Sequence, residues 1–297
     1  MSQMKWTQVT VTTTQEASEA IANRLFELGA TGVEVKDEAT LIAYFPMDDR
    51  VGERIRALRQ FISRLAEFGI DAAHTAIALR SIEDDNWAES WKSAFPPLRI
   101  GKRFLIVPTW VDVTPQPSEI LLRLDPGMAF GTGQHATTRL SLELLELAME
   151  GGERVADIGT GSGVLAIAAA KLGASHIDAV DVDPTVLPIA KRNFETNGVA
   201  SIIRLLRGDG LLALEGEYDL ILANILAKVI LPMIPDFRRY LRPRGRLILS
   251  GISTAEVSQI EGALEANVLQ IAETRQQESW VGILARYTKQ KRPLPFC

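Results

Sequence analysis

The alternation of apolar and polar residues predicts a small α+β unit at the start of the chain. Residues 4–14 alternate as a strand does, and residues 15–28 carry apolar side chains at helical spacing, with Gly29 to end the helix. Two strands, a long amphipathic helix and a last strand follow, at residues 31–39, 40–46, 48–68 and 74–83. This order is that of a ferredoxin-like fold. Residues 1–83 offer no convergent titratable residues, which favours a substrate-recognition or docking role for this domain.

A linker helix is predicted over residues 84–97, because Pro96 and Pro97 end the helical pattern there. Trp87 and Trp91 lie four positions apart, and so share one helical face. That spacing favours a role as anchors that pack the linker against a domain.

Residues 98–290 alternate apolar strands with amphipathic helices, which is the pattern of an α/β doubly wound sheet. A strand at 155–158, a glycine turn and a small-residue helix at 164–172 lead to a second strand that ends at Asp181. The helices and strands predicted after it lie at residues 184–197, 201–209, 218–226, 227–241, 244–252 and 254–266, with a closing hairpin at 268–289. Pro232 and Pro235 predict a kink or a break in the helix at 227–241. The basic tail 291–297 is expected to be disordered.

The turn after residue 158 has the residues of a nucleotide pocket. Gly159, Gly161 and Gly163 allow close approach of a ligand to the backbone, and the N–H groups of the following helix face that ligand. Asp181, 22 positions after Gly159, is placed to accept hydrogen bonds from both hydroxyls of a ribose. These residues predict a nucleoside site at the carboxyl edge of the sheet.

The spacing of the glycines helps to identify the nucleoside. A dinucleotide fingerprint, G-x-G-x-x-G, would need its third glycine at Val164 or Ala166, so the fit is poor. The spacing found, D-x-G-x-G-x-G from Asp157 to Gly163, resembles motif I of class I S-adenosylmethionine-dependent methyltransferases. The resemblance implies a Rossmann-like class I methyltransferase fold for residues 98–290.

A second glycine-rich loop lies in residues 124–146, with glycines at 127, 131 and 133. We expect this loop to wrap a ligand, with Phe130 closing over an adenosine or methionine moiety. Thr137 or Thr138 is predicted to cap the helix that follows. His135 is interpreted as a hydrogen-bonded structural residue and not as a base.

The strings DPGMAFGTGQHATT, VADIGTGSG, AVDVDP and LILANIL, with DNWAESWK and FPPLRIGKRFLIVPTW upstream, are similar to the family of methyltransferases that modify large-subunit ribosomal protein eleven. The resemblance covers essentially the whole chain. It implies an S-adenosylmethionine cofactor with S-adenosylhomocysteine as product, no metal, and successive methylation of N-terminal and lysine amines of that protein, free or on the ribosome. The residues implied to bind the cofactor are Thr138, Gly159, Asp181, Asn224, Gly161, Phe130 and Asp209.

Asn224 is the expected catalytic residue, because it falls at the carboxyl end of the strand at 218–226, where ligands bind in open α/β sheets. Its side-chain oxygen can accept a hydrogen bond from an amine, while the carbonyls of Ile225 and Leu226 take others. Methyltransferases of planar bases commonly carry N-P-P-Y or D-P-P-Y here, where the aromatic ring stacks on the base. This chain has NILA, which suits a flexible aliphatic amine.

The composition limits which partners, metal sites and cellular compartment we expect. The net charge is −5 with both signs interspersed, which disfavours a sequence-specific nucleic-acid binder. Cys297 is the single cysteine and the three histidines are widely spaced, so neither a disulfide nor a metal cluster is expected. No apolar run is long enough to span a membrane. We expect a cytoplasmic monomer.

Three alternatives stay open on the sequence alone. The first is a lysine methyltransferase for another protein, such as an electron-transfer flavoprotein, which the long N-terminal domain disfavours. The second is a nicotinamide-dependent oxidoreductase. The third is a catalytically silent module that docks on ribosomes, against which Asn224 and the glycine loop speak.

Overall fold

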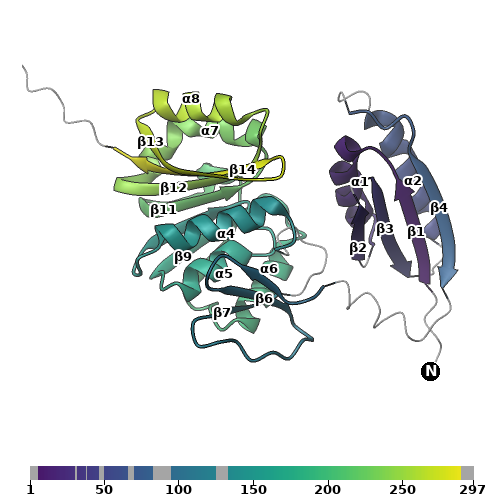
Figure 1. Cartoon of the computed structure of the whole chain (residues 1–297), viewed down its shortest axis with the longest axis horizontal. Helices are drawn as coiled ribbons and strands as arrows, with labels where there is room; N and C mark the ends of the chain where they lie inside the picture. The colour runs from purple at the N-terminus through teal and green to yellow at the C-terminus, as the bar shows by residue number, and fades with distance from the viewer. Residues whose placement is uncertain are drawn as a thin grey trace, which may run out of the picture. The chain divides into compact units, whose positions relative to one another are not determined.

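The computed structural model describes residues 6–30, 32–37, 39–46, 50–65, 70–82, 95–124 and 133–288 (Figure 1). The chain divides into an N-terminal unit, Met1–Pro96, and a C-terminal unit, Pro97–Cys297. The predicted linker helix lies almost wholly outside the described residues, as do Trp87, Trp91 and the basic tail. Among the described residues, no helix has the length and apolar content needed to cross a bilayer.

The N-terminal unit has the predicted ferredoxin-like order of elements. These are β1 (Trp6–Thr12), α1 (Gln15–Glu27), β2 (Gly32–Asp37), β3 (Thr40–Pro46), α2 (Val51–Arg64) and β4 (Ala76–Ile82). The strands form an antiparallel sheet in the order β2-β3-β1-β4. Every second residue of β1 and β3 is buried with both helices in one core, which includes Val9, Val11, Ile21, Leu25, Leu41 and Leu58. The alternation in the sequence thus marks the face that the helices cover.

The C-terminal unit is the predicted doubly wound sheet, with a small sheet before it. The small sheet joins β5 (Leu98–Ile100), β6 (Phe104–Pro108) and β7 (Ile120–Leu124). The large sheet has the order β10-β9-β8-β11-β12-β14-β13. Its strands are β8 (Arg154–Ile158), β9 (His176–Asp181), β10 (Ile203–Arg207), β11 (Tyr218–Asn224), β12 (Leu241–Ser253), β13 (Leu269–Gln277) and β14 (Trp280–Tyr287). The first five are parallel, and β14 runs antiparallel between β12 and β13.

Helices cover both faces of the large sheet (Figure 1). One core is shared with α4 (Ala136–Ala148), α5 (Val164–Lys171) and α6 (Leu187–Thr196), and the other with η3 (Gly210–Ala213), α7 (Ala227–Tyr240) and α8 (Val257–Ala266). Because β8, β9, β10 and β11 are parallel neighbours, their carboxyl ends meet at one edge. Residues that follow these strands can therefore form one site.

The predictions for α7 and β10 differ from the structure. The sequence predicts a kink or a break at Pro232 and Pro235; α7 continues from Ala227 to Tyr240 with both prolines inside it, so there is no break, and a kink stays a prediction. β10 ends at Arg207, and Asp209 lies beyond it as the residue before η3.

A buried carboxylate ties four strands together near their amino-terminal ends. Asp178 of β9 is fully buried and accepts hydrogen bonds from Arg204 Nε (2.6 Å), Tyr218 Oη (2.6 Å), Arg154 Nη2 (3.2 Å) and the His176 ring (3.1 Å). Burial alone would raise the pKa of Asp178, but these hydrogen bonds outweigh it and lower the pKa to about 2. The charge is therefore retained inside the sheet by its partners.

Candidate active site

The glycine turn follows β8 and is joined to the end of β9. The N–H groups of Gly159 and Thr160 both donate to the carbonyl of Val180, at 2.9 and 3.0 Å. Gly159, Gly161 and Gly163 have φ angles of 72°, 53° and 82°, which side chains disfavour. A Cβ atom at Gly159 would also overlap Cγ2 of Ile225. The first glycine is therefore required by packing against the segment after β11 as well as by its backbone angle.

Asp181 lies at the tip of β9, as predicted, beside the glycine turn. Its Oδ2 accepts the N–H of Gly161 at 2.9 Å, and its Oδ1 accepts the N–H of Asp183 at 3.0 Å. The two backbone donors fix the orientation of the carboxylate. Each carboxylate oxygen has a further lone pair, so Asp181 can still accept the hydroxyls of a ribose.

Asp157 is a second acidic residue of the site, and the sequence indicated it only as the first position of the glycine motif. Its side chain is 1% exposed, and Oδ2 accepts the hydroxyl of Thr160 at 2.7 Å. Burial raises the pKa of Asp157 to about 7, against the lowering effect of the Thr160 hydrogen bond, and the charge of Asp181 adds to the rise. Near neutral pH this carboxyl group is poised between its two protonation states.

Asn224 is the last residue of β11, and its amide reaches α4. Its Nδ2 donates to Oγ1 of Thr138 at 3.5 Å, and Thr138 itself is fully buried. Its Oδ1 is buried and has no hydrogen-bond partner in the described part of the chain. A buried acceptor without a donor is costly, and a ligand N–H would satisfy it. Asn224 thus has the free acceptor that the sequence interpretation required.

The carbonyl of Leu226 does not have the predicted role. It already accepts the N–H groups of Val229 (2.9 Å) and Ile230 (3.2 Å), because Leu226 is the residue before α7. Two backbone donors occupy both lone pairs of that oxygen. The prediction that Leu226 would accept a hydrogen bond from an amine is therefore wrong.

α4 begins at a cap different from the predicted one. Neither Thr137 nor Thr138 is the N-cap; the N-cap is His135, whose Nδ1 lies 3.3 Å from the Thr137 N–H and 2.7 Å from Thr137 Oγ1. Its ring lies edge-on to Trp280, with centroids 5.0 Å apart. Burial lowers the pKa of His135, so the imidazole stays neutral and can accept the bond. The prediction of a hydrogen-bonded structural role for His135 is confirmed.

Asp209 and Phe130 are the remaining predicted residues of the cofactor site. Asp209 is exposed before η3, and the preceding Gly208 donates its N–H to the carbonyl of Asp181 at 3.0 Å. Asp209 therefore follows a residue that contacts the tip of β9. Phe130 and the glycines at 127 and 131 lie outside the described residues. The structure brings together Thr138 with Asn224, and Gly159 and Gly161 with the end of β9.

Comparisons with known proteins agree with this geometry. A family model described as "Ribosomal protein L11 methyltransferase (PrmA)" matches residues 5–288. Proteins named ribosomal protein L11 methyltransferase from Exiguobacterium sp. and Halalkalibacterium halodurans are 40% and 38% identical to the chain; each match covers 95% of this chain and 99% of the relative. The crystal structure of a ribosomal protein L11 methylase from Lactobacillus delbrueckii subsp. bulgaricus is 38% identical with a TM-score of 0.62, over 65% of this chain and 99% of that one.

Proposed function

The chain belongs to the ribosomal protein L11 methyltransferase family, and we propose that it transfers methyl groups from S-adenosylmethionine to amino groups of ribosomal protein L11. The observation that carries the proposal is the buried, unsatisfied Oδ1 of Asn224 in the described part of the site. It lies at the edge of the sheet where the glycine turn and Asp181 meet.

The residues of the site fit S-adenosylmethionine. Positive-φ glycines at 159 and 161 leave room beside the backbone for a ligand, and Asp181, whose carboxylate is held by the N–H groups of Gly161 and Asp183, is proposed to accept the ribose hydroxyls. Asp209 is proposed to face the adenine amino group, and Thr138 and Phe130 to contact the remainder of the molecule. When bound, S-adenosylmethionine supplies a methyl group on a sulfonium, and the thioether that departs needs no proton.

Asn224 is proposed to orient the amine that is methylated. The Oδ1 acceptor can take one N–H of the neutral amine, so that the nitrogen lone pair faces the methyl about 3 Å away. Deprotonation costs roughly 4.6 kcal/mol for a lysine at pH 7 and about 1 kcal/mol for an α-amine. The α-amine is thus the easier target, and burial of a lysine would lower its pKa. We propose that the protein methylates both kinds of amine.

Residues 1–83 are proposed to recruit the protein substrate, and the C-terminal unit to perform the transfer. Successive methylation requires the product amine to rotate or to leave between rounds, so the site must accept a dimethylated amine. The string NILA at residues 224–227 has no aromatic ring to stack on a planar base, and this supports an aliphatic amine. A product limited to the monomethyl form would contradict this part of the proposal.

A direct test mixes the purified protein, S-adenosylmethionine and ribosomal protein L11, and measures L11 by mass spectrometry. We expect increases by multiples of one methyl group, and none with Asn224→Ala. S-adenosylmethionine should raise the melting temperature, whereas NAD(H) should not. An unchanged L11 mass with a correctly folded protein would refute the proposal. Free L11 and assembled ribosomes, compared in parallel, identify the form that is used.

A further inference from the structure

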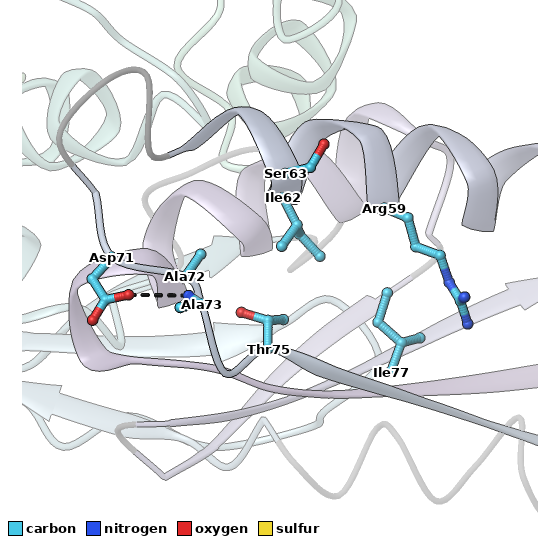
Figure 2. A pocket seen from close by; sticks show the side chains of 8 residues that line it. All are labelled: Arg59, Ile62, Ser63, Asp71, Ala72, Ala73, Thr75 and Ile77. Atoms are coloured by element: carbon cyan, nitrogen blue, oxygen red, sulfur yellow. Dashed lines mark hydrogen bonds between the residues drawn. The ribbon is translucent and has the colours of Figure 1, made fainter.

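The N-terminal unit contains a pocket of about 510 Å³ between α2 and β4. Figure 2 shows Ile62 and Ser63 of α2 above it, Thr75 and Ile77 below it, and the loop of Asp71 to Ala73 closing one end. Arg59 reaches from α2 at the other end. Hydrogen bonds hold the loop in place, from Thr14 Oγ1 to the Asp71 carbonyl (2.5 Å), from the Ala73 N–H to Asp71 Oδ1 (3.0 Å) and from the Thr75 N–H to the Ala72 carbonyl (3.1 Å). The pocket is therefore an ordered part of the fold, with apolar side chains at its centre and charged side chains at its two ends.

One side of this pocket is an edge strand, because β4 is the last of the described strands in the order β2-β3-β1-β4. Its outer edge carries backbone groups that can pair with an added strand. An extended peptide that pairs with such an edge presents every second side chain to the face that the helices cover. A groove between an edge strand and a helix thus provides backbone hydrogen bonds and a side-chain pocket together.

Leu79 shows that the core-facing side of β4 is incompletely covered. Leu79 pairs with Val9 of β1 and lies on the same face of the sheet, yet Leu79 is 53% exposed while Val9 is fully buried. Ile77 pairs in the same way with the fully buried Val11 and is itself half-buried at the pocket. Two aliphatic side chains of the core face are therefore open to a further apolar group from outside the sheet.

The charges around the groove restrict what can enter it. Arg59 of α2 is exposed at one end. Asp71 lies at the other end, with one carboxylate oxygen already bonded to the loop. The groove is complementary to a segment that has two features. An aliphatic side chain of the segment would contact Ile62, Ile77 and Leu79, and an acidic side chain would lie near Arg59.

We propose that the groove between α2 and β4 binds an extended segment of the protein substrate, which adds a strand to the edge of β4. The segment inserts an aliphatic side chain between Ile62 and Ile77 and places an acidic side chain beside Arg59. The inference rests on the proposed methylation of L11 and assigns the surface of the N-terminal unit that holds L11. Binding through backbone pairing keeps the substrate attached while different amines reach the other unit.

Substitutions at matched positions test the groove. Leu79→Lys and Arg59→Glu should each raise the KM for L11 about tenfold, with the kcat at saturating L11 and the KM for S-adenosylmethionine unchanged. Val35→Lys is the control for Leu79, because Val35 is 62% exposed on the other edge strand and pairs with the fully buried Leu41. Arg56→Glu is the control for Arg59, since Arg56 is exposed on α2 but does not line the pocket. Both controls should leave the KM for L11 unchanged.

Hydrogen exchange tests the added strand in the wild-type protein. Addition of L11 should slow amide exchange in residues 76–82 and not in residues 32–37. Equal KM values for L11 in Leu79→Lys, Arg59→Glu and their controls would refute the proposed binding in the groove. Slower amide exchange in residues 32–37, and not in residues 76–82, would refute it as well. Full protection of 76–82 in the free protein would also overturn it, because the chain itself would then cover the edge. If the wild-type protein does not methylate L11 at all, it is the proposed function that fails.

Discussion

The amide of Asn224 donates to the hydroxyl of Thr138 at 3.5 Å, which links the end of β11 to the first turn of α4. The link leaves Asn224 Oδ1 as a buried acceptor without a partner in the described residues; Asp157 Oδ1 is another. Because an amide carries its donors and its acceptor in one plane, holding the NH₂ group fixes the direction of the oxygen. Thr138 thus orients the atom proposed to accept the substrate amine.

Removal of the Thr138 hydroxyl should therefore reduce turnover. Thr138→Val keeps the shape of the side chain but loses the acceptor for Asn224, and we expect kcat to fall by about 10- to 100-fold. Thr138→Ser keeps the hydroxyl and should retain most of the wild-type kcat. Methyl incorporation into L11 at saturating substrates measures both variants. Equal rates for the Val and Ser variants would show that the hydroxyl does not orient Asn224.

A side chain at Gly159 should disrupt the site through Ile225. Gly159→Ala combines a positive φ of 72° with overlap of the Ile225 side chain, whereas Gly152→Ala has a φ of 88° and open space around it. The backbone penalty is about 1–2 kcal/mol in both, and overpacking adds about 1–3 kcal/mol at Gly159 only. Urea denaturation and calorimetry with S-adenosylhomocysteine measure the difference. Adding Ile225→Ala to Gly159→Ala should recover part of the stability; no recovery would argue against the overlap.

The turn itself was predictable because its cause is local. Glycine spacing, the apolar strand before it and the small-residue helix after it are all continuous in the chain, so the sequence predicted that Gly159, Gly161 and Asp181 lie together at the ends of β8 and β9. The doubly wound sheet and the ferredoxin-like unit followed from periodicity for the same reason, whereas the separate small sheet of β5, β6 and β7 was not predicted. The differences at Asp209, which lies beyond the end of β10, and at the prolines of α7, which do not break the helix, are small by comparison.

Features that depend on packing across the sheet were not predictable. The side chain of Ile225, which follows β11, lies against Gly159, which follows β8. No sequence pattern near either position indicates this contact. His135 takes the cap of α4 because its ring is positioned beside Trp280, 145 positions later in the chain. The degree of burial that shifts the pKa of Asp157 likewise exists only once the sheet has formed.

The Asp178 network should make a large contribution to stability. Asp178→Asn leaves Arg154 and Arg204 without their shared carboxylate, and we expect a loss of about 3–5 kcal/mol at pH 7. Asp236→Asn breaks the exposed pair with Arg239 and should cost less than about 1 kcal/mol. Because the folded pKa of Asp178 is about 2, below its ordinary 3.8, the contribution is complete above pH 3.8 and is lost as the pH falls toward 2. Urea denaturation at pH 7 and pH 3 should show a smaller deficit at pH 3; an equal deficit would contradict the assignment.

Asp157 should have the opposite pH dependence. Its folded pKa of about 7 lies above the ordinary 3.8, so its contribution to stability is fully present below pH 3.8 and is lost as the pH rises through 7. Asp157→Asn removes the titration, and the ligand-free variant should gain stability over the wild type progressively from pH 4 to pH 7, with no further gain above. Melting temperatures across this range, with Asp236→Asn as the reference, measure the trend. A difference that is independent of pH would show that Asp157 stays charged in the folded protein.

Protonation of His135 should weaken ligand binding through the cap of α4. Burial lowers the pKa of His135 below its ordinary 6.5; the charge of Glu278 opposes this shift and that of Arg139 adds to it. The neutral ring caps α4, so the stabilisation is present above pH 6.5 and is lost as the pH falls through the lower folded pKa.

The affinity for S-adenosylhomocysteine tests this dependence by calorimetry between pH 7 and pH 5. His135→Asn supplies a side chain that caps helices well and does not titrate in this range. The ratio of wild-type to His135→Asn affinity should fall with pH, and taking the ratio removes the contribution of other groups such as Asp157. His135→Ala has no cap at any pH and should bind more weakly than His135→Asn throughout. A constant ratio from pH 7 to pH 5 would show that protonation of His135 does not affect ligand binding through Thr138 and Asn224.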